Sequence, residues 1–329
     1  MRRQLWMALV ALGLVATGSL AAEGLPSYAP LPHKISSFGA CVSDGYLYIY
    51  GGHTGRTHTY STETTTDKFL RVALAGKWEE LPSGPAAQGT ALVAYQNKIY
   101  RIGGMQPRNK PGEKADTHSL ASCASYDPTA RKWTALPDLP EPRSSHDAVV
   151  VGEKLYVFGG WTMRGAGKEP VWLKQGLVLD LSKSPLQWEA VAQPFQRRAL
   201  GIAALDGKVY VVGGLQAKGA PSNQVDIYDL AMGKWSEGAA IPGMGTGFSA
   251  APAVQNGRLY LSTNDGKLHT LNRAINDWVT VGQQATARHV NRMVAGARGT
   301  LLIVGGSASA GDSKVIEVIP TASKKVSSR

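Results

Sequence analysis

The sequence predicts an all-β protein in which six four-stranded sheets are arranged in a ring. The main observation is an apolar run that ends in a glycine pair, as in Lys154-Leu-Tyr-Val-Phe-Gly-Gly160, and recurs along the chain. The first glycine of the pair stands at positions 51, 103, 159, 213 and 305, and a further copy at residues 258–264 keeps the strand without the glycines. A repeat of about 50 residues built on such a strand is typical of propeller blades.

Within each repeat we expect four strands, which the third repeat shows at residues 147–151, 155–158, 176–181 and 188–191. Asp-Gly or Asn-Gly pairs separate the first two strands in several copies, and such pairs accept the positive φ of a two-residue hairpin. The fourth strand carries a tryptophan, at positions 78, 133, 188, 235 and 278. These tryptophans could stack on a carbohydrate, but their fixed position favours packing between blades. The glycine pair indicates a close backbone approach or a bulge.

The two ends of the repeated region complement each other. The sixth repeat ends after its third strand, at residues 315–319, without a tryptophan strand. Residues 25–32, which precede the first repeat, have the proline pattern found where a fourth strand ends. We therefore predict that this N-terminal strand closes the last blade and ties the ring together.

This combination of strand, glycine pair and late tryptophan resembles the kelch-repeat β-propellers, over essentially all of the chain after residue 23. The resemblance implies one six-bladed propeller domain over residues 23–322. It also implies that the loop before each first strand and the loop after each second strand emerge on the same face, around the central channel. Because one fold hosts many activities, the fold alone assigns no function.

Residues 1–22 have the features of a cleavable signal peptide. Arg2 and Arg3 precede an apolar stretch over residues 5–16, and Ser19-Leu20-Ala21 forms a cleavage site of the small-x-small type. The alternative, a membrane anchor, needs roughly 20 apolar residues, more than this stretch has. We expect a secreted or periplasmic mature protein that begins near Ala22 and is not inserted into a membrane. Residues 323–329 are expected to form a disordered tail.

Charge and cysteine content limit the partners and cross-links. The formal net charge is +11, and a basic excess attracts anionic ligands. Because no basic run with interleaved aromatic residues occurs, we expect no nucleic-acid partner. Cys41 and Cys123 are expected on the innermost strand of the first repeat and the third strand of the second. Two buried free thiols are favoured over a disulfide.

Basic residues gather unevenly in the loops of the expected channel face. Sixteen residues before the first glycine of the pair lie Arg143, Arg197 and His289, with Arg198 and Arg288 adjacent to them. The full set of candidate ligand-binding residues is Arg143, His146, Arg197, Arg198, Arg288, His289, Asn291 and Arg292 before the first strands, with His53, Arg56, Trp161 and Arg164 after the second strands. Guanidinium groups form bidentate bonds to carboxylate or phosphate, so this set predicts a mouth for an anionic ligand. The alternative is that these arginines hold their own loops through backbone carbonyls.

Signs of catalysis are few. No Ser/His/Asp arrangement stands out, so no catalytic residue is assigned. His53 and His58 have no carboxylate or cysteine at a recognisable metal-ligand spacing, so neither a metal nor another cofactor is expected.

Among kelch propellers, the chain resembles the periplasmic N-acetylneuraminate epimerase (sialic acid mutarotase) family. The shared features are the signal peptide, the Leu-Pro-rich N-terminal segment and the final Leu-Leu-Ile-Val-Gly-Gly strand, while Arg143 and Arg288 stand where that family has Pro-Arg and Gly-Arg. The resemblance implies acid–base chemistry at an anomeric centre. The loop over residues 215–223 lacks the Glu and Arg that the family has there.

The sequence therefore favours a propeller that binds a ligand on its loop face, either an anionic sugar or a protein. One alternative is a sugar-acid mutarotase related to the sialic acid family. The other is a scaffold for protein–protein interactions that uses the same face.

Overall fold

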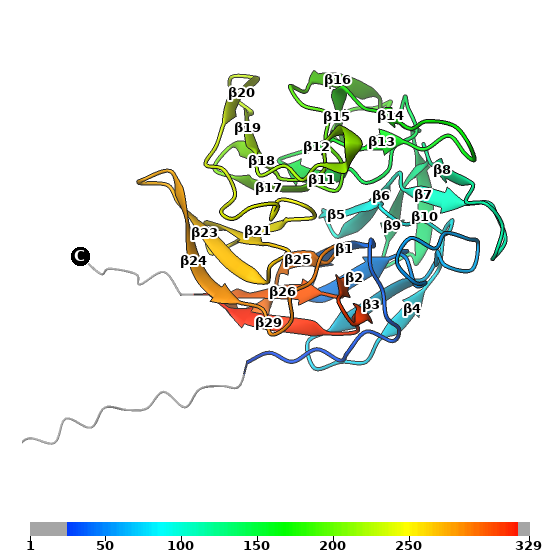
Figure 1. Ribbon diagram of the computed structural model, residues 1–329, viewed down its shortest axis with the longest axis horizontal. Helices are drawn as coiled ribbons and strands as arrows, with labels where there is room; N and C mark the ends of the chain where they lie inside the picture. Colours follow the sequence, from blue (N-terminus) through cyan, green and yellow to red (C-terminus); the bar gives the residue numbers. More distant parts are fainter. Residues whose placement is uncertain (1–24, 322–329) are drawn as a thin grey trace, which may run out of the picture.

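The computed structural model describes residues 25–321, in which six β-sheets form a closed ring around a central channel (Figure 1). This arrangement confirms the predicted all-β, six-bladed propeller. The predicted signal peptide at residues 1–22 and the predicted tail at residues 323–329 lie outside the described residues. In the described range, no helix has the length and apolar character needed to cross a membrane.

Blades one to three are four-stranded antiparallel sheets. Blade one consists of β1 (Gly39–Ser43), β2 (Tyr46–Tyr50), β3 (Phe69–Ala73) and β4 (Glu79–Leu81). Blade two consists of β5 (Ala91–Tyr95), β6 (Lys98–Ile102), β9 (Cys123–Asp127) and β10 (Lys132–Leu136). Blade three consists of β11 (Asp147–Val151), β12 (Lys154–Phe158), β15 (Gln175–Asp180) and β16 (Trp188–Ala192).

Blades four and five are also four-stranded, whereas blade six has three strands. Blade four consists of β17 (Gly201–Leu205), β18 (Lys208–Val212), β19 (Val225–Asp229) and β20 (Lys234–Glu237). Blade five consists of β21 (Ala251–Gln255), β22 (Arg258–Ser262), β23 (Lys267–Asn272) and β24 (Asp277–Gln283). Blade six consists of β25 (Arg292–Ala295), β26 (Thr300–Val304) and β29 (Ile316–Pro320).

The first strand of each blade lies innermost, so that β1, β5, β11, β17, β21 and β25 follow one another around the channel (Figure 1). In five blades, the loop before this strand pairs with the loop after the second strand of the same blade. The bridged residues are Ser36 with His53, Gln88 with Met105, Ser144 with Trp161, Arg198 with Leu215 and His289 with Ser307. Both sets of loops therefore share one face, as the kelch resemblance implied.

Short elements extend these loops. After the second strands of blades two, three and six come the hairpins β7 (Met105–Pro107) with β8 (Thr117–Ser119), β13 (Trp161–Thr162) with β14 (Val171–Trp172), and β27 (Ser307–Ala308) with β28 (Gly311–Asp312). Blade four has a 3₁₀ turn, η1 (Ala217–Gly219), in the same place. The loops on this face therefore differ in structure from one blade to the next.

The recurring tryptophans join neighbouring blades, as predicted. The indole N–H of Trp133 in blade two donates to the Pro82 carbonyl of blade one (2.7 Å), and that of Trp188 in blade three donates to the Pro137 carbonyl of blade two (2.9 Å). The same bond recurs from Trp235 to Ala192 and from Trp278 to Ala239. Each of these bonds joins a tryptophan to the exit of the preceding blade, so the tryptophans help to hold neighbouring blades together.

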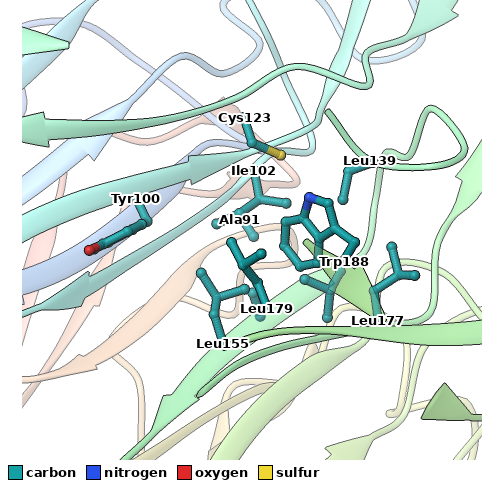
Figure 2. Close-up of a cluster of buried hydrophobic side chains, with 11 residues drawn as sticks. Ala91, Tyr100, Ile102, Cys123, Leu139, Leu155, Leu177, Leu179 and Trp188 are labelled. Carbon is teal, nitrogen blue, oxygen red and sulfur yellow. The ribbon is translucent and has the colours of Figure 1, made fainter. Parts of the chain in front are cut away.

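Figure 2 shows the apolar side of one such joint. Trp188 packs in a buried cluster with Ile102 and Leu139 from blade two and with Leu177 and Leu179 from its own blade. Each joint of this kind removes an aromatic side chain and its aliphatic neighbours from water, which is the main stabilising contribution of the fold.

The glycine pairs mark the places where one blade meets the next loop. The Gly104 N–H of blade two donates to the Arg143 carbonyl (2.8 Å), and Gly103 has a φ of 54°. A Cβ atom on Gly103 would lie 2.5 Å from that carbonyl oxygen, closer than a side chain can approach. Blades one, three, four and six make the same hydrogen bond to the carbonyls of residues 87, 197, 247 and 35. The predicted close backbone approach is confirmed.

The ring closes through the N-terminal segment, although this segment forms no regular fourth strand. The Leu31 N–H donates to the Lys314 carbonyl beside β29 (2.9 Å), and the Trp78 indole donates to the Pro30 carbonyl (2.8 Å). The segment therefore takes the place of a fourth-strand exit, as predicted, but residues 25–31 belong to no strand. Prolines at positions 26, 30 and 32 have no N–H to donate, which prevents a continuous ladder.

Both cysteines are buried and free, as predicted. Cys41 lies in β1 and Cys123 in β9, the strands expected from the repeat pattern. Burial raises the pKa of both thiols, to about 12 for Cys123. Because the thiolate is the reactive form, both groups are poorly reactive at neutral pH.

The closure predicts a difference between two leucines of the N-terminal segment. Leu31 is 2% exposed in the apolar cluster between blades six and one, whereas Leu25 is 56% exposed. Leu31→Ala should lower the free energy of unfolding by about 2–4 kcal/mol because it leaves a cavity. Leu25→Ala, the matched control, should change it by less than about 0.5 kcal/mol. Urea unfolding measures both values, and equal effects would contradict closure through this segment.

Candidate functional site

A ring of hydrogen bonds connects the loops that precede the first strands. One residue of each loop has a positive φ, and we call this set the channel ring: Ser37, Gly89, Ser145, Ala199, Ser249 and Val290. The N–H of each donates to the carbonyl of its counterpart in the preceding blade, as from Gly89 to Ser37 (2.6 Å) and from Ala199 to Ser145 (2.7 Å). At Val290 the acceptor is the Ser249 hydroxyl instead. The channel ring fixes every loop relative to the next.

A cavity of about 780 Å³ opens along the channel at this ring. Its wall consists of the channel ring, the inner strands and parts of the loops after the second strands. Of the twelve residues singled out from the sequence, seven line the cavity: His53, His146, Trp161, Arg198, His289, Asn291 and Arg292. The other five lie elsewhere: Arg56, Arg143, Arg164, Arg197 and Arg288.

Arg143 and Arg288, two residues before the channel ring, point into their own blades. The Arg143 Nη1 donates to the Gly159 carbonyl (3.0 Å). The Arg288 Nη1 donates to the Gly305 carbonyl (3.1 Å), and its Nη2 forms an ion pair with Glu317 (3.1 Å). Both side chains are 2% exposed, so these arginines hold their loops onto the glycine pair.

Arg197 has the same role in blade four. It is 1% exposed, forms an ion pair with the buried Asp226 and covers the ring of Phe195 at 4.4 Å from the centroid. Burial lowers the pKa of Arg197 and also that of Arg143, the latter to about 10. These three arginines therefore hold their own loops, which is the alternative that the sequence left open. The positive charge in the cavity comes from other residues.

When the blades are aligned on the channel ring, the loop of blade six shifts by one residue relative to the alignment made from the sequence. Counting along the sequence placed His289 level with Arg143 and Arg197, but the structure places Arg288 there. The connection between β25 and β26 spans residues 296–299 and contains η2 (Ala297–Gly299), whereas the same connection in blades one to five has two residues. His289 is instead equivalent to Arg198, and both line the cavity.

The position just before the channel ring differs most in chemistry between blades. From blade one to blade six its occupants are Ser36, Gln88, Ser144, Arg198, Phe248 and His289. Three consecutive blades thus present a guanidinium, a phenyl ring and an imidazole to the cavity, and we call Arg198, Phe248 and His289 the mouth triplet. The ring centroids of Phe248 and His289 are 5.6 Å apart.

Arg198 is the least engaged cation of the cavity. Its Cζ lies 3.9 Å from the centroid of Trp161, whose ring packs against Trp172 (5.6 Å between centroids). The Arg198 Nε is buried without a hydrogen-bond partner. No salt bridge found between residues 25 and 321 includes this side chain. Burial lowers the pKa of Arg198, but an arginine stays charged at neutral pH.

Deeper in the channel, an ion pair crosses between opposite blades. Arg292 of blade six and Asp147 of blade three stand two residues after the channel ring, where the other blades have glycine or alanine. The Arg292 Nη1 lies 2.9 Å from the Asp147 carboxylate, and its Nε and Nη2 donate to the carbonyls of Phe38 and Thr90. Both charges are therefore matched within the protein.

The histidines that line the cavity differ in their hydrogen bonding and in their pKa shifts. His146 is 2% exposed, and both of its ring nitrogens lack a hydrogen-bond partner. Burial and the charges of Arg143 and Arg292 lower the pKa of His146 well below its usual value, and burial also lowers the pKa of His289. The His53 Nε2 is hydrogen-bonded to a carbonyl of its own loop (2.8 Å). In the part of the chain described, no group of three or more His, Cys, Asp or Glu side chains could hold a metal ion.

Some cavity residues were not found from the sequence. Tyr60, Asp147 and Phe248 line the cavity, whereas the candidates Arg56 and Arg164 are exposed outside it. Asp147 directly follows the candidate His146, whereas Phe248 lies in blade five, which has no glycine pair from which its loop could be aligned. Tyr60 lies in the loop between β2 and β3 of blade one, and no repeated motif marks its position.

The lowered pKa of His146 predicts a pH dependence of stability. The unfolded chain takes up this proton below about pH 6.5 but the native chain does not, so the stabilisation is present above that pH and is lost as the pH falls. His146→Leu, which introduces the residue of the equivalent position 200, should remove up to about 2 kcal/mol of the loss between pH 6.5 and 5. Urea unfolding at several pH values measures this, and an unchanged slope would contradict the assignment.

Comparison with solved structures and family models agrees with the observed fold. Residues 89–306 match the model of the KLHDC2/KLHL20/DRC7 Kelch-repeats domain, and residues 35–64 match the Kelch motif. A solved structure, "Structure of YjhT", resembles this one with a TM-score of 0.72 over 90% of this chain and 97% of that chain. Its sequence identity is 16%, so the likeness shows the fold alone.

Curated relatives carry the same repeats. Kelch-like protein 35 of Mus musculus is 27% identical over 74% of this chain and 36% of its own length, and Kelch-like protein terF of Aspergillus terreus is 28% identical over 65% and 46%. This chain thus matches less than half the length of either protein. The N-(sulfonatooxy)prop-2-enimidothioate sulfolyase of Thlaspi arvense is 27% identical over 63% of both chains. With the glycine-pair strands, the six-bladed ring and the family model in agreement, this chain belongs to the kelch-repeat family of β-propellers.

Proposed function

We propose that this protein binds a small organic anion in the cavity of its loop face and that Arg198 holds the anionic group. The observation that carries the proposal is the state of Arg198, a half-buried guanidinium that lines the cavity. Unlike Arg197 and Arg292, its side chain forms no hydrogen bond or salt bridge found among the described residues. A desolvated cation is stabilised when an anion supplies both a counter-charge and hydrogen-bond acceptors. The face of Trp161 holds the guanidinium plane in place for such a ligand.

The charge of the cavity supports an anion. Asp147 is the one acidic side chain among the described residues that line the cavity, and Arg292 already neutralises it. The sulfolyase relative is named for a substrate with a sulfonatooxy group, which is an anion. We also propose that the protein is exported, because residues 1–22 have the features of a signal peptide.

Mutarotation of a sugar acid is the second candidate, implied by the resemblance to N-acetylneuraminate epimerases. It is favoured by His289, which lines the cavity and whose lowered pKa leaves the ring neutral and able to accept a proton. The loop over residues 215–223 contributes no carboxylate to complete an acid–base pair. Binding without catalysis is therefore the first choice.

The test is calorimetric titration with N-acetylneuraminate, benzoate and hexyl sulfate as anion probes. Arg198→Ala should weaken the binding of every bound probe by about 1.5–3 kcal/mol, or about 10- to 150-fold, because a charge-assisted hydrogen bond is lost. Arg56→Ala removes the same charge from an exposed position outside the cavity and should leave the affinity unchanged.

Two results would overturn this proposal. One is equal affinity of the Arg198→Ala variant and the parent, and the other is the absence of binding for all three probes. If the parent accelerates anomer exchange of N-acetylneuraminate in an NMR assay and His289→Gln abolishes the effect, the mutarotase candidate replaces binding alone.

A further inference from the structure

Three polar side chains at the cavity mouth are hydrogen-bonded within the protein. The Ser36 hydroxyl donates to the Asp312 carboxylate (3.0 Å), and the Gln88 amide donates to the Thr65 hydroxyl (3.1 Å). The Ser249 hydroxyl accepts the Val290 N–H of the channel ring. By contrast, His146, Trp161 and Arg198 each have a buried side-chain nitrogen without a hydrogen-bond partner.

Aromatic rings from four other blades line the same cavity as Arg198 of blade four. Trp161 comes from blade three and Phe248 from blade five, so these rings belong to the two blades that flank Arg198. His289 comes from blade six, two blades away, and Tyr60 comes from blade one, which lies opposite blade four (Figure 1 shows the order of the blades). Burial raises the pKa of Tyr60 and the charge of Arg198 opposes this rise, in keeping with their proximity.

The two flanking rings differ in what they offer to a ligand. The face of Trp161 is covered by the Arg198 guanidinium at 3.9 Å. Phe248 instead packs beside His289, with 38° between the two ring planes, and both rings line the cavity. The Phe248 side of the mouth is thus an aromatic wall in the blade that follows Arg198, and aromatic rings stack with an offset or meet edge to face.

We propose that the anionic group is carried on a planar aromatic ring, as in an aryl carboxylate, sulfate or phosphate. The ligand ring packs against Phe248 and His289 while its anionic group bonds to Arg198. This inference rests on the proposed anion binding and deepens it, because it replaces a sugar acid by an aryl anion as the preferred ligand class. Phe248 is then the residue that determines this specificity.

The test compares benzoate with cyclohexanecarboxylate, which has the same charge and a similar size but no aromatic face. Benzoate should bind about three- to tenfold more tightly to the parent protein. Phe248→Leu should abolish this ratio while both ligands still bind, and Arg198→Ala should weaken both ligands equally. Met244→Leu, in the same loop and 99% exposed, is the matched control and should change neither affinity. Phenyl phosphate and phenyl sulfate identify the preferred anionic group.

The possible outcomes separate the two proposals. Equal affinity for benzoate and cyclohexanecarboxylate, or tighter binding of N-acetylneuraminate than of benzoate, would overturn the aryl specificity and leave anion binding intact. A benzoate preference that persists in Phe248→Leu would overturn the role of Phe248. Arg198-dependent binding of N-acetylneuraminate or hexyl sulfate but of neither benzoate nor cyclohexanecarboxylate would overturn the aryl specificity alone. Failure of every anion probe to bind in an Arg198-dependent way would overturn both proposals.

Discussion

The hydrogen-bonded channel ring is the constraint on which the rest of the structure depends. Each of its six residues adopts a positive φ in order to pass a hydrogen bond to the next blade. A left-handed conformation is costly for residues such as Ser37 and Val290, so the surrounding contacts must hold it in place. The glycine pairs and the tryptophan indoles provide these contacts, because each joins one blade to the loop or exit of a neighbour. Each blade is thus held by contacts with both of its neighbours.

The position of a residue relative to the channel ring decides whether its side chain supports the fold or faces the cavity. Two residues before it, Arg143, Arg197 and Arg288 turn into their blades and hold the loops. One residue before it, the mouth triplet faces the cavity. Two residues after it, Arg292 and Asp147 meet across the channel. Since adjacent residues of an extended loop point in opposite directions, a one-residue difference in position decides between scaffold and site.

The sequence predicted the repeated parts of the fold and few details of the site, for a physical reason. The glycine pair occurs in five of the six blades and the tryptophan in five, and each meets the same packing demand wherever it occurs, so their periodicity reveals the ring. Ligand-facing residues have no such periodicity, because each blade contributes a different side chain. Phe248 lies in a loop without basic residues, and Asp147 is the first residue of an inner strand. The longer connection of blade six then shifted His289 by one position, and the prolines of the N-terminal segment prevented the regular strand expected there.

The central claim, that neighbouring residues of one loop divide between scaffold and site, is tested most directly by urea unfolding of two adjacent variants. Arg197→Ala leaves the Asp226 carboxylate buried without its partner and should lower the free energy of unfolding by about 3–5 kcal/mol. Arg198→Ala removes a side chain with no ion partner in the described range and should lower it by less than about 1 kcal/mol. Equal losses in the two variants, or a larger loss for Arg198→Ala, would contradict the account.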